Sequence, residues 1–181
     1  MIFLQEIRVE KLDERREKRM VADYIEILFE HISRLEIIQI VSELKYNIDD
    51  IKSSYYYLSS KEGNEHLSLS KMINLINNQY NITIMFDSII MFELKLNNVL
   101  VMISSECKDY DLTFNFEKEL FDNDIIKENI VKVICNFSAK LKDRLIYIGH
   151  EPVEDEDMRN LRICNGKITC LNREEGYWNA F

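Results

Sequence analysis

The chain has 181 residues, 46% of them hydrophobic and 30% charged, which fits one globular domain and excludes a disordered protein. Its four glycines include no close pair, which excludes a glycine-rich phosphate-binding loop. The formal net charge of −9 disfavours nucleic acid as a partner, because a phosphate backbone repels a negative surface. We predict a single domain over residues 1–181, in which residues 10–60 could form an N-terminal helical subregion.

The compartment is predicted from apolar runs and cysteines. No run of apolar residues is long enough for a transmembrane helix, and the first residues lack the basic and apolar segments of a secretory signal. The cysteines contain no CxxC pair and suit reduced thiols better than a disulfide framework; they are Cys107, Cys135, Cys164 and Cys170. A cytoplasmic protein without a membrane partner is therefore expected.

In the N-terminal third, apolar residues recur at three- and four-residue steps between Asp13 and Leu35, which predicts an amphipathic helix. This helix would carry His31 as a half-buried residue. Residues 35–45 either continue as helix or form a strand, because Ile and Val are dense there. Residues 52–58 predict a strand whose adjacent tyrosines, Tyr55 to Tyr57, point to alternating faces. Between residues 35 and 58 the choice between helix and strand stays open.

The central part predicts a helix that begins at Ser68 or Ser70 and ends near Tyr80. Strands are expected at 82–86, 89–96, 99–105 and 112–117, with turns at Asp87-Ser88, at Asn97-Asn98 and at 108–111. A second helix, capped by Asp122 or Asp124, runs to Leu141, and a strand follows at 145–148. This order predicts an α+β fold in which an antiparallel meander sheet packs helices on one face.

The clearest local signal is the dipeptide Asn165-Gly166, which lies between two alternating segments and predicts a C-terminal β-hairpin over 161–170. In a two-residue loop, Cys164 opposes Lys167 and Cys170 opposes Leu161. The two cysteines then face opposite sides of the hairpin and should not bond to each other.

An acidic run after the 145–148 strand is the main candidate for chemistry. A calcium loop needs alternating oxygen ligands and a central glycine, whereas these acids are contiguous and include no glycine. We therefore predict no metal and no cofactor. The histidines, His31, His66 and His150, lie in no catalytic signature, so no catalytic residues and no enzyme activity are predicted.

The same run favours binding. Five acids within residues 150–157 concentrate negative potential on a connection after a strand. Tyr147 and Trp178 supply aromatic anchors of the type that dominates binding interfaces. The predicted contact surface for a basic partner is Glu151, Glu154, Asp155, Glu156, Asp157, Tyr147 and Trp178.

The stretch Tyr147-Ile148-Gly149-His150-Glu151-Pro152, with its acidic continuation to Arg159, resembles small immunity proteins of bacterial polymorphic-toxin and contact-dependent inhibition systems. The resemblance extends in general organisation over residues 68–160. It implies a cytosolic inhibitor that binds a cognate toxin domain, often a basic nuclease, and blocks its active site by charge and shape. No catalytic residues follow from it.

Two alternatives from other classes remain at this level. One is a metal-dependent hydrolase that uses His150 and the neighbouring acids. The other is a homo-oligomeric structural protein in which the 161–170 hairpin forms a paired edge. The identity of the toxin, the position of the contact surface and the oligomeric state are not determined by the sequence.

Overall fold

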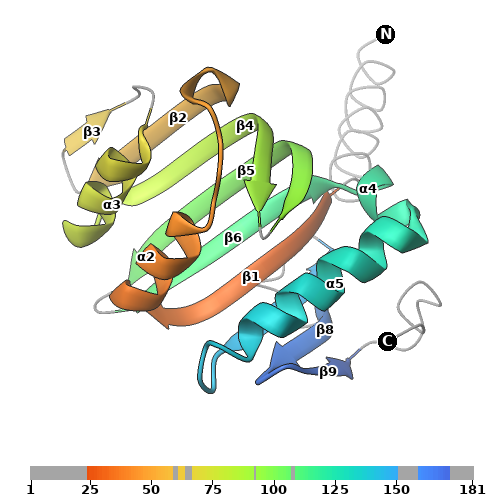
Figure 1. Ribbon diagram of the computed structural model, residues 1–181. Coiled ribbons are helices and arrows are strands. Elements are labelled where there is room, and N and C mark those ends of the chain that lie inside the picture. The colour runs from red at the N-terminus through yellow and green to blue at the C-terminus, as the bar shows by residue number, and fades with distance from the viewer. Residues whose placement is uncertain are drawn as a thin grey trace, which may run out of the picture.

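The computed structural model describes residues 24–58, 61–63, 67–91, 93–106, 109–150 and 159–171. Within them, nine antiparallel strands form one sheet in the order β3-β2-β4-β5-β6-β1-β7-β8-β9 (Figure 1). The strands are β1 (Tyr24–Ser33), β2 (Ile51–Leu58), β3 (Lys61–Gly63), β4 (Asn81–Met91), β5 (Leu94–Glu106), β6 (Asp109–Glu117), β7 (Leu145–His150), β8 (Arg159–Cys164) and β9 (Lys167–Cys170).

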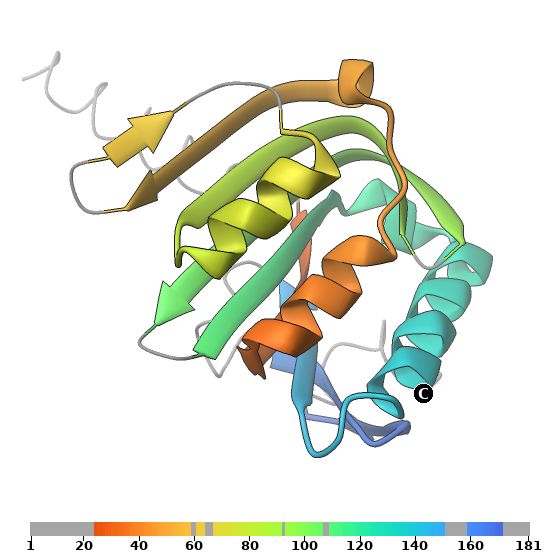
Figure 2. The same ribbon diagram turned by 60° about the vertical axis from the view of Figure 1, so that its left-hand side comes forward.

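The helices are α2 (Arg34–Ser42), the 3-10 turn η1 (Ile48–Asp50), α3 (Leu69–Asn77), α4 (Glu119–Asp122) and α5 (Asp124–Ser138). The sheet curves around α2, α3 and α5, which lie on one face (Figure 2). The core lies between these layers and contains the inward side chains of the sheet, such as Phe29, Phe86 and Phe114. The predicted α+β class, with an antiparallel sheet, helices on one face and a C-terminal hairpin, is confirmed. None of the described helices is long and apolar enough to cross a membrane.

The predicted helix over 13–35 is wrong where the structure describes it, because residues 24–33 form β1 in the middle of the sheet, between β6 and β7. Residues 25–29 are buried without a break, as in a strand that is covered on both faces. Such a run also satisfies helical spacing, so periodicity does not separate the two. His31 lies at an irregularity of this strand with φ 52° and an exposed side chain, so its prediction as a half-buried helical residue is also wrong.

Residues 35–58, for which the sequence did not decide between helix and strand, contain helix α2 and then strand β2. Ser33 caps α2 in a capping box, where its hydroxyl accepts from Glu36 N–H and the Glu36 carboxylate accepts from Ser33 N–H. β2 confirms the predicted strand, with Tyr55 and Tyr57 exposed and Tyr56 packed against Tyr80 on the opposite face. The short β3, for which the sequence analysis gave no prediction, pairs with β2 at the edge of the sheet.

The predicted turns at Asp87-Ser88 and Asn97-Asn98 are wrong. β4 and β5 continue through both positions and pair Phe86 with Val99. The chain instead reverses between Met91 and Leu94, which are partners in the ladder. Asn98 does adopt a positive φ of 53°, but as a local irregularity within β5. Asparagine accepts this conformation readily, so a positive φ at Asn98 does not require a hairpin turn.

The second helical segment starts at Asn123, whose side chain accepts from the backbone N–H of Ile125 and of Ile126, so the cap is neither Asp122 nor Asp124. Ile130, Ile134 and Phe137 of α5 are buried. Residues 109–111, predicted as a turn, belong to β6. Helix α3 is capped by Ser68, which is one of the two residues predicted for this cap.

The C-terminal hairpin has the predicted register, with Cys164 opposite Lys167 and Leu161 opposite Cys170. Asn165 and Gly166 both have positive φ, 49° and 72°, as a type I′ turn requires. The turn is attached to α5, because the Cys135 thiol donates to the Gly166 carbonyl over 2.9 Å and Gly166 N–H donates to Ser138 Oγ over 2.8 Å. Cys164 and Cys170 are not bonded to each other, as the register predicted.

Candidate partner-binding surfaces

Most of the predicted contact surface lies outside the described residues: Glu151, Glu154, Asp155, Glu156, Asp157 and Trp178. Tyr147 is described, in β7, where its side chain faces away from the helices and packs with Leu28. The Arg159 guanidinium lies 3.9 Å from the centre of the Tyr147 ring, and Tyr147 is 7% exposed. A role of Tyr147 in binding stays a prediction. Among the described residues no group of three His, Cys, Asp or Glu could hold a metal ion.

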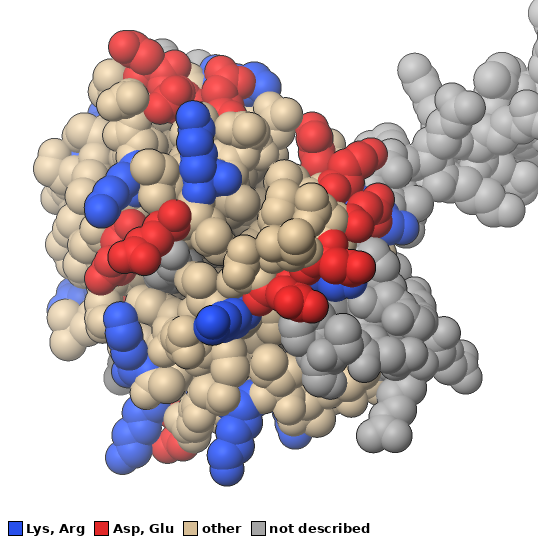
Figure 3. All heavy atoms as spheres, turned by 45° about the vertical axis from the view of Figure 1, so that its right-hand side comes forward, with Lys and Arg blue, Asp and Glu red and all other residues tan. Residues whose placement is uncertain are grey.

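An acidic surface does lie within the described residues, at α4 and the start of α5. Figure 3 shows Asp and Glu side chains gathered there. At its centre Ile125 is 72% exposed, an unusual position for a large apolar side chain. We call this surface the α4–α5 acidic patch; its exposed acids are Glu117, Glu119, Asp122, Asp124 and Glu128. The sequence already shows several acids within residues 117–124. The predicted contact surface was instead placed on the acids of residues 151–157.

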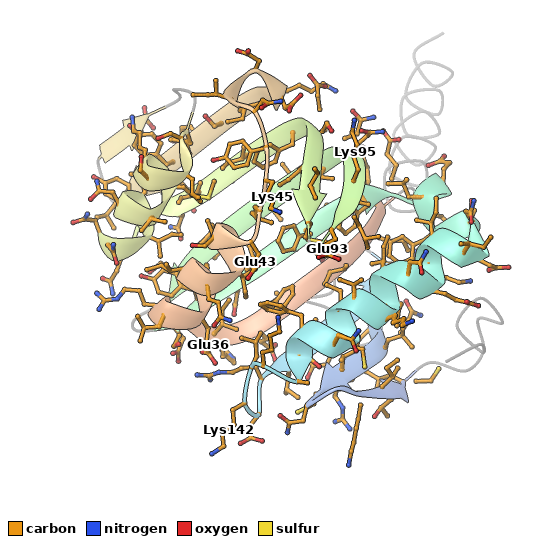
Figure 4. All side chains as sticks on the ribbon, in the orientation of Figure 1. Glu36, Glu43, Lys45, Glu93, Lys95 and Lys142 are labelled. Carbon is orange, nitrogen blue, oxygen red and sulfur yellow. The ribbon has the colours of Figure 1, made fainter. Side chains whose placement is uncertain are left out.

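On the helical face, the tip of the β4–β5 hairpin is joined to the segment that follows α2. Lys45 N–H donates to the Ile90 carbonyl over 2.9 Å, and Ile90 N–H donates back to the Lys45 carbonyl over 2.8 Å. This two-bond bridge holds the end of α2 beside the hairpin (Figure 4). Two of the hollows on this face are lined in part by residues near the bridge.

The larger hollow has a volume of about 350 Å³. Tyr46 forms part of its wall, with its hydroxyl donating to the Leu67 carbonyl over 2.9 Å and its ring 4.9 Å from that of Phe86. Burial raises the pKa of Tyr46 to about 12, so this hydroxyl stays protonated and keeps donating at neutral pH. The lining also carries basic side chains; it consists of Lys45, Tyr46, Asn47, Asp50, Ser88, Ile89, Ile90 and Lys95.

The smaller hollow has a volume of about 220 Å³ and the opposite charge on its walls. Glu43 lies at the C-terminal cap of α2, and Glu93 lies at the tip of the β4–β5 hairpin. The floor comes from α5, with Phe137 buried and Val133 half-buried. We call it the Glu43–Glu93 hollow; its lining is Glu43, Glu93, Val133, Asn136, Phe137 and Lys140. Sequence reasoning missed it, because its residues come from three separate segments.

The opposite face of the sheet carries aromatic side chains near its β2 edge. Tyr55 and Tyr57 are 41% and 44% exposed, with ring centres 5.8 Å apart. The Tyr55 hydroxyl donates to Glu62 over 2.6 Å, and this hydrogen bond raises the pKa of Tyr55. No described helix lies on this face (Figure 2).

Comparison with known proteins identifies the family. A family model described as PABL017 Cdi1I immunity protein matches residues 23–165. A chain of the crystal structure of the toxic C-terminal tip of CdiA from Pseudomonas aeruginosa in complex with immune protein has the same fold. Its TM-score is 0.56 at 18% identity, over 83% of this chain and 99% of that chain. The comparison with curated proteins gave no match. Because the family model covers most of the chain, including the stretch whose resemblance was noted in the sequence, this chain belongs to the PABL017 Cdi1I immunity protein family.

Proposed function

We propose that this protein neutralises a cognate toxin by binding it, as a non-catalytic inhibitor in the cytoplasm. The observation that carries the proposal is the family match over residues 23–165. The similar solved structure belongs to a complex of a toxin tip with its immune protein, which supports binding as the mode of action.

The charge of the chain supports a basic toxin domain as the partner. A net charge of −9 produces long-range attraction to a cationic surface and raises the rate of encounter. Both the α4–α5 acidic patch and the predicted acids of residues 151–157 would contribute to this attraction.

The test is whether the protein binds, and protects against, the toxin domain encoded beside its own gene. We expect a complex of the two purified proteins on size-exclusion chromatography, and growth of cells that express both. A toxin that still kills cells containing the folded immunity protein, and that does not co-elute with it, would refute the proposal. A metal analysis of the purified protein separates this function from the hydrolase alternative, which requires bound metal.

The predicted contact acids are tested by charge reversal. Replacing Glu154, Asp155 and Glu156 with Lys should slow association with the toxin by about 10-fold or more, because steering depends on the summed potential. The matched control reverses three acids of the α4–α5 acidic patch, Glu119, Asp122 and Glu128, and so changes the net charge equally. If the two triple variants associate at equal rates, total charge matters and residues 151–157 have no special role.

A further inference from the structure

We propose that the Glu43–Glu93 hollow receives one cationic side chain of the toxin, and that an arginine fits it best. This inference rests on the proposed function, since it names a contact within the toxin complex. It assigns a binding role to two carboxylates that lie outside the predicted contact acids.

The lining of the hollow matches both parts of a long cationic side chain. Its floor, Val133 and Phe137, is apolar and can cover the methylene stem. Its walls place a carboxylate on each side, from Glu43 at the end of α2 and from Glu93 at the hairpin tip (Figure 4). Arginine is favoured over lysine because its planar fork can donate to two carboxylates at once and can stack on an aromatic ring.

The two wall carboxylates outnumber the one cation of the lining, Lys140, so the hollow keeps a net negative charge. No ion pair or side-chain hydrogen bond is recorded within the described part of the chain for Glu43 or Glu93, whereas other acids, such as Glu30, Glu36 and Asp87, are paired with Arg or Lys. The floor already tolerates a cation, because Lys140 Nζ lies 5.6 Å from the centre of the Phe137 ring. An incoming guanidinium would share this ring or displace the exposed Lys140 from it.

The backbone of Glu93 gives an independent argument. Glu93 has φ 72°, in a two-residue hairpin loop where glycine or asparagine is favoured and glutamate is disfavoured. Strained residues of this kind are concentrated at functional sites, and here the strained residue lines the hollow.

The neighbouring hollow sets the direction in which a partner can bind. Lys45 and Lys95 line it, so the hairpin presents positive charge towards one hollow and negative charge towards the other (Figure 4). A toxin segment that places its arginine at Glu43 and Glu93 would be repelled if it were reversed. This polarity favours a single orientation of the complex.

The test compares two double variants that remove the same two negative charges. Glu43→Gln with Glu93→Gln should weaken the equilibrium binding of the cognate toxin by about 10- to 100-fold, mainly through faster dissociation. The matched control, Asp49→Asn with Asp109→Asn at two exposed acids outside the candidate surfaces, should change affinity less than about 3-fold. Equal affinities of the two double variants would overturn the inference, while the wild-type complex would still support the proposed function.

A second variant separates binding from folding. Glu93→Gly relieves the positive φ, so its melting temperature should rise by about 1 to 4 °C while its affinity for the toxin falls. Loss of affinity in a more stable protein excludes unfolding as the cause. If Glu93→Gly binds as tightly as the wild-type protein, the carboxylate has no role in the complex and the inference fails.

Discussion

At the scale of single residues, the ion pair between Glu36 and Arg144 joins two segments that are far apart in the sequence. Arg144 Nε donates to both Glu36 carboxylate oxygens over 3.0 Å, and its Nη1 donates to the His31 carbonyl over 2.9 Å. The same carboxylate accepts from Ser33 N–H in the capping box. One side chain thus caps α2 and ties it to the segment between α5 and β7. Burial raises the pKa of Glu36, but the hydrogen bonds from Arg144 and Ser33 outweigh burial, and the net pKa is lowered.

This shift predicts a pH-dependent loss of stability. A carboxyl whose pKa is lower in the folded state stabilises the fold above its unfolded value of 4.5, and the contribution disappears as pH falls through the lower folded pKa. Glu36→Gln keeps a capping-box residue and removes the charge. We expect it to lose about 1 to 2 kcal/mol of unfolding free energy at pH 7 and much less at pH 3, measured by urea denaturation.

The control for this prediction is Glu128→Gln, which alters an exposed acid on α5. It should change stability by less than about 0.5 kcal/mol at either pH. A Glu36→Gln variant that is equally destabilised at pH 7 and pH 3 would show that its loss arises from packing and not from the charge.

At the scale of elements, two hairpins show what a turn sequence can and cannot specify. Asn165-Gly166 determines its own turn, because both residues accept positive φ without strain. The β4–β5 hairpin turns at a position without any turn signal, and Asn97-Asn98, which has such a signal, remains inside a strand. The pairing of two long strands along their length fixed the site of reversal there. In that register the alternating apolar residues of both strands reach the core, which outweighs the preference of two turn residues.

The type I′ turn leads to a test at Gly166. A Cβ there would lie 3.4 Å from Ala139 Cβ and 3.7 Å from the Cys135 carbonyl oxygen, so space is adequate and backbone conformation is the obstacle. Gly166→Ala should therefore cost about 1 kcal/mol, seen as a lower denaturant midpoint with an unchanged slope. Gly166→Asn is the matched change at the same position, because asparagine also adds a Cβ but accepts a positive φ, and it should cost less than Gly166→Ala. An unaffected Gly166→Ala midpoint would contradict the assigned turn.

At the scale of the whole molecule, the curved sheet presents different surfaces on its two faces. The helical face carries the Glu43–Glu93 hollow and its basic neighbour, and the opposite face carries Tyr55 and Tyr57. The α4–α5 acidic patch lies at one end of the molecule (Figure 3). The net charge of −9 acts over the whole surface and adds to every approach of a cationic partner.

This charge predicts a dependence of association on salt. Raising ionic strength from about 0.05 to 0.5 M shortens the screening length, so the association rate with a basic toxin should fall by about 10-fold or more. The dissociation rate should change less, because contacts within the complex are shielded from solvent. Stopped-flow or surface-based kinetics across a salt series measure both rates. An association rate that is independent of salt would remove electrostatic steering from the proposed function.

The sequence by itself determined features that depend on a few neighbouring residues. They are the alternating tyrosines of β2, the register of the C-terminal hairpin and the acidic net charge, and it narrowed the cap of α3 to Ser68 or Ser70. The tertiary structure decided the identity of β1, the position of the β4–β5 turn and the meeting of Glu43 with Glu93 in one hollow. The physical reason is the range of the interactions. Caps and Asn-Gly turns are fixed within about four residues of chain. A strand that is buried on both faces has no periodicity of its own, and it becomes a strand only because β6 and β7 pair with its two edges.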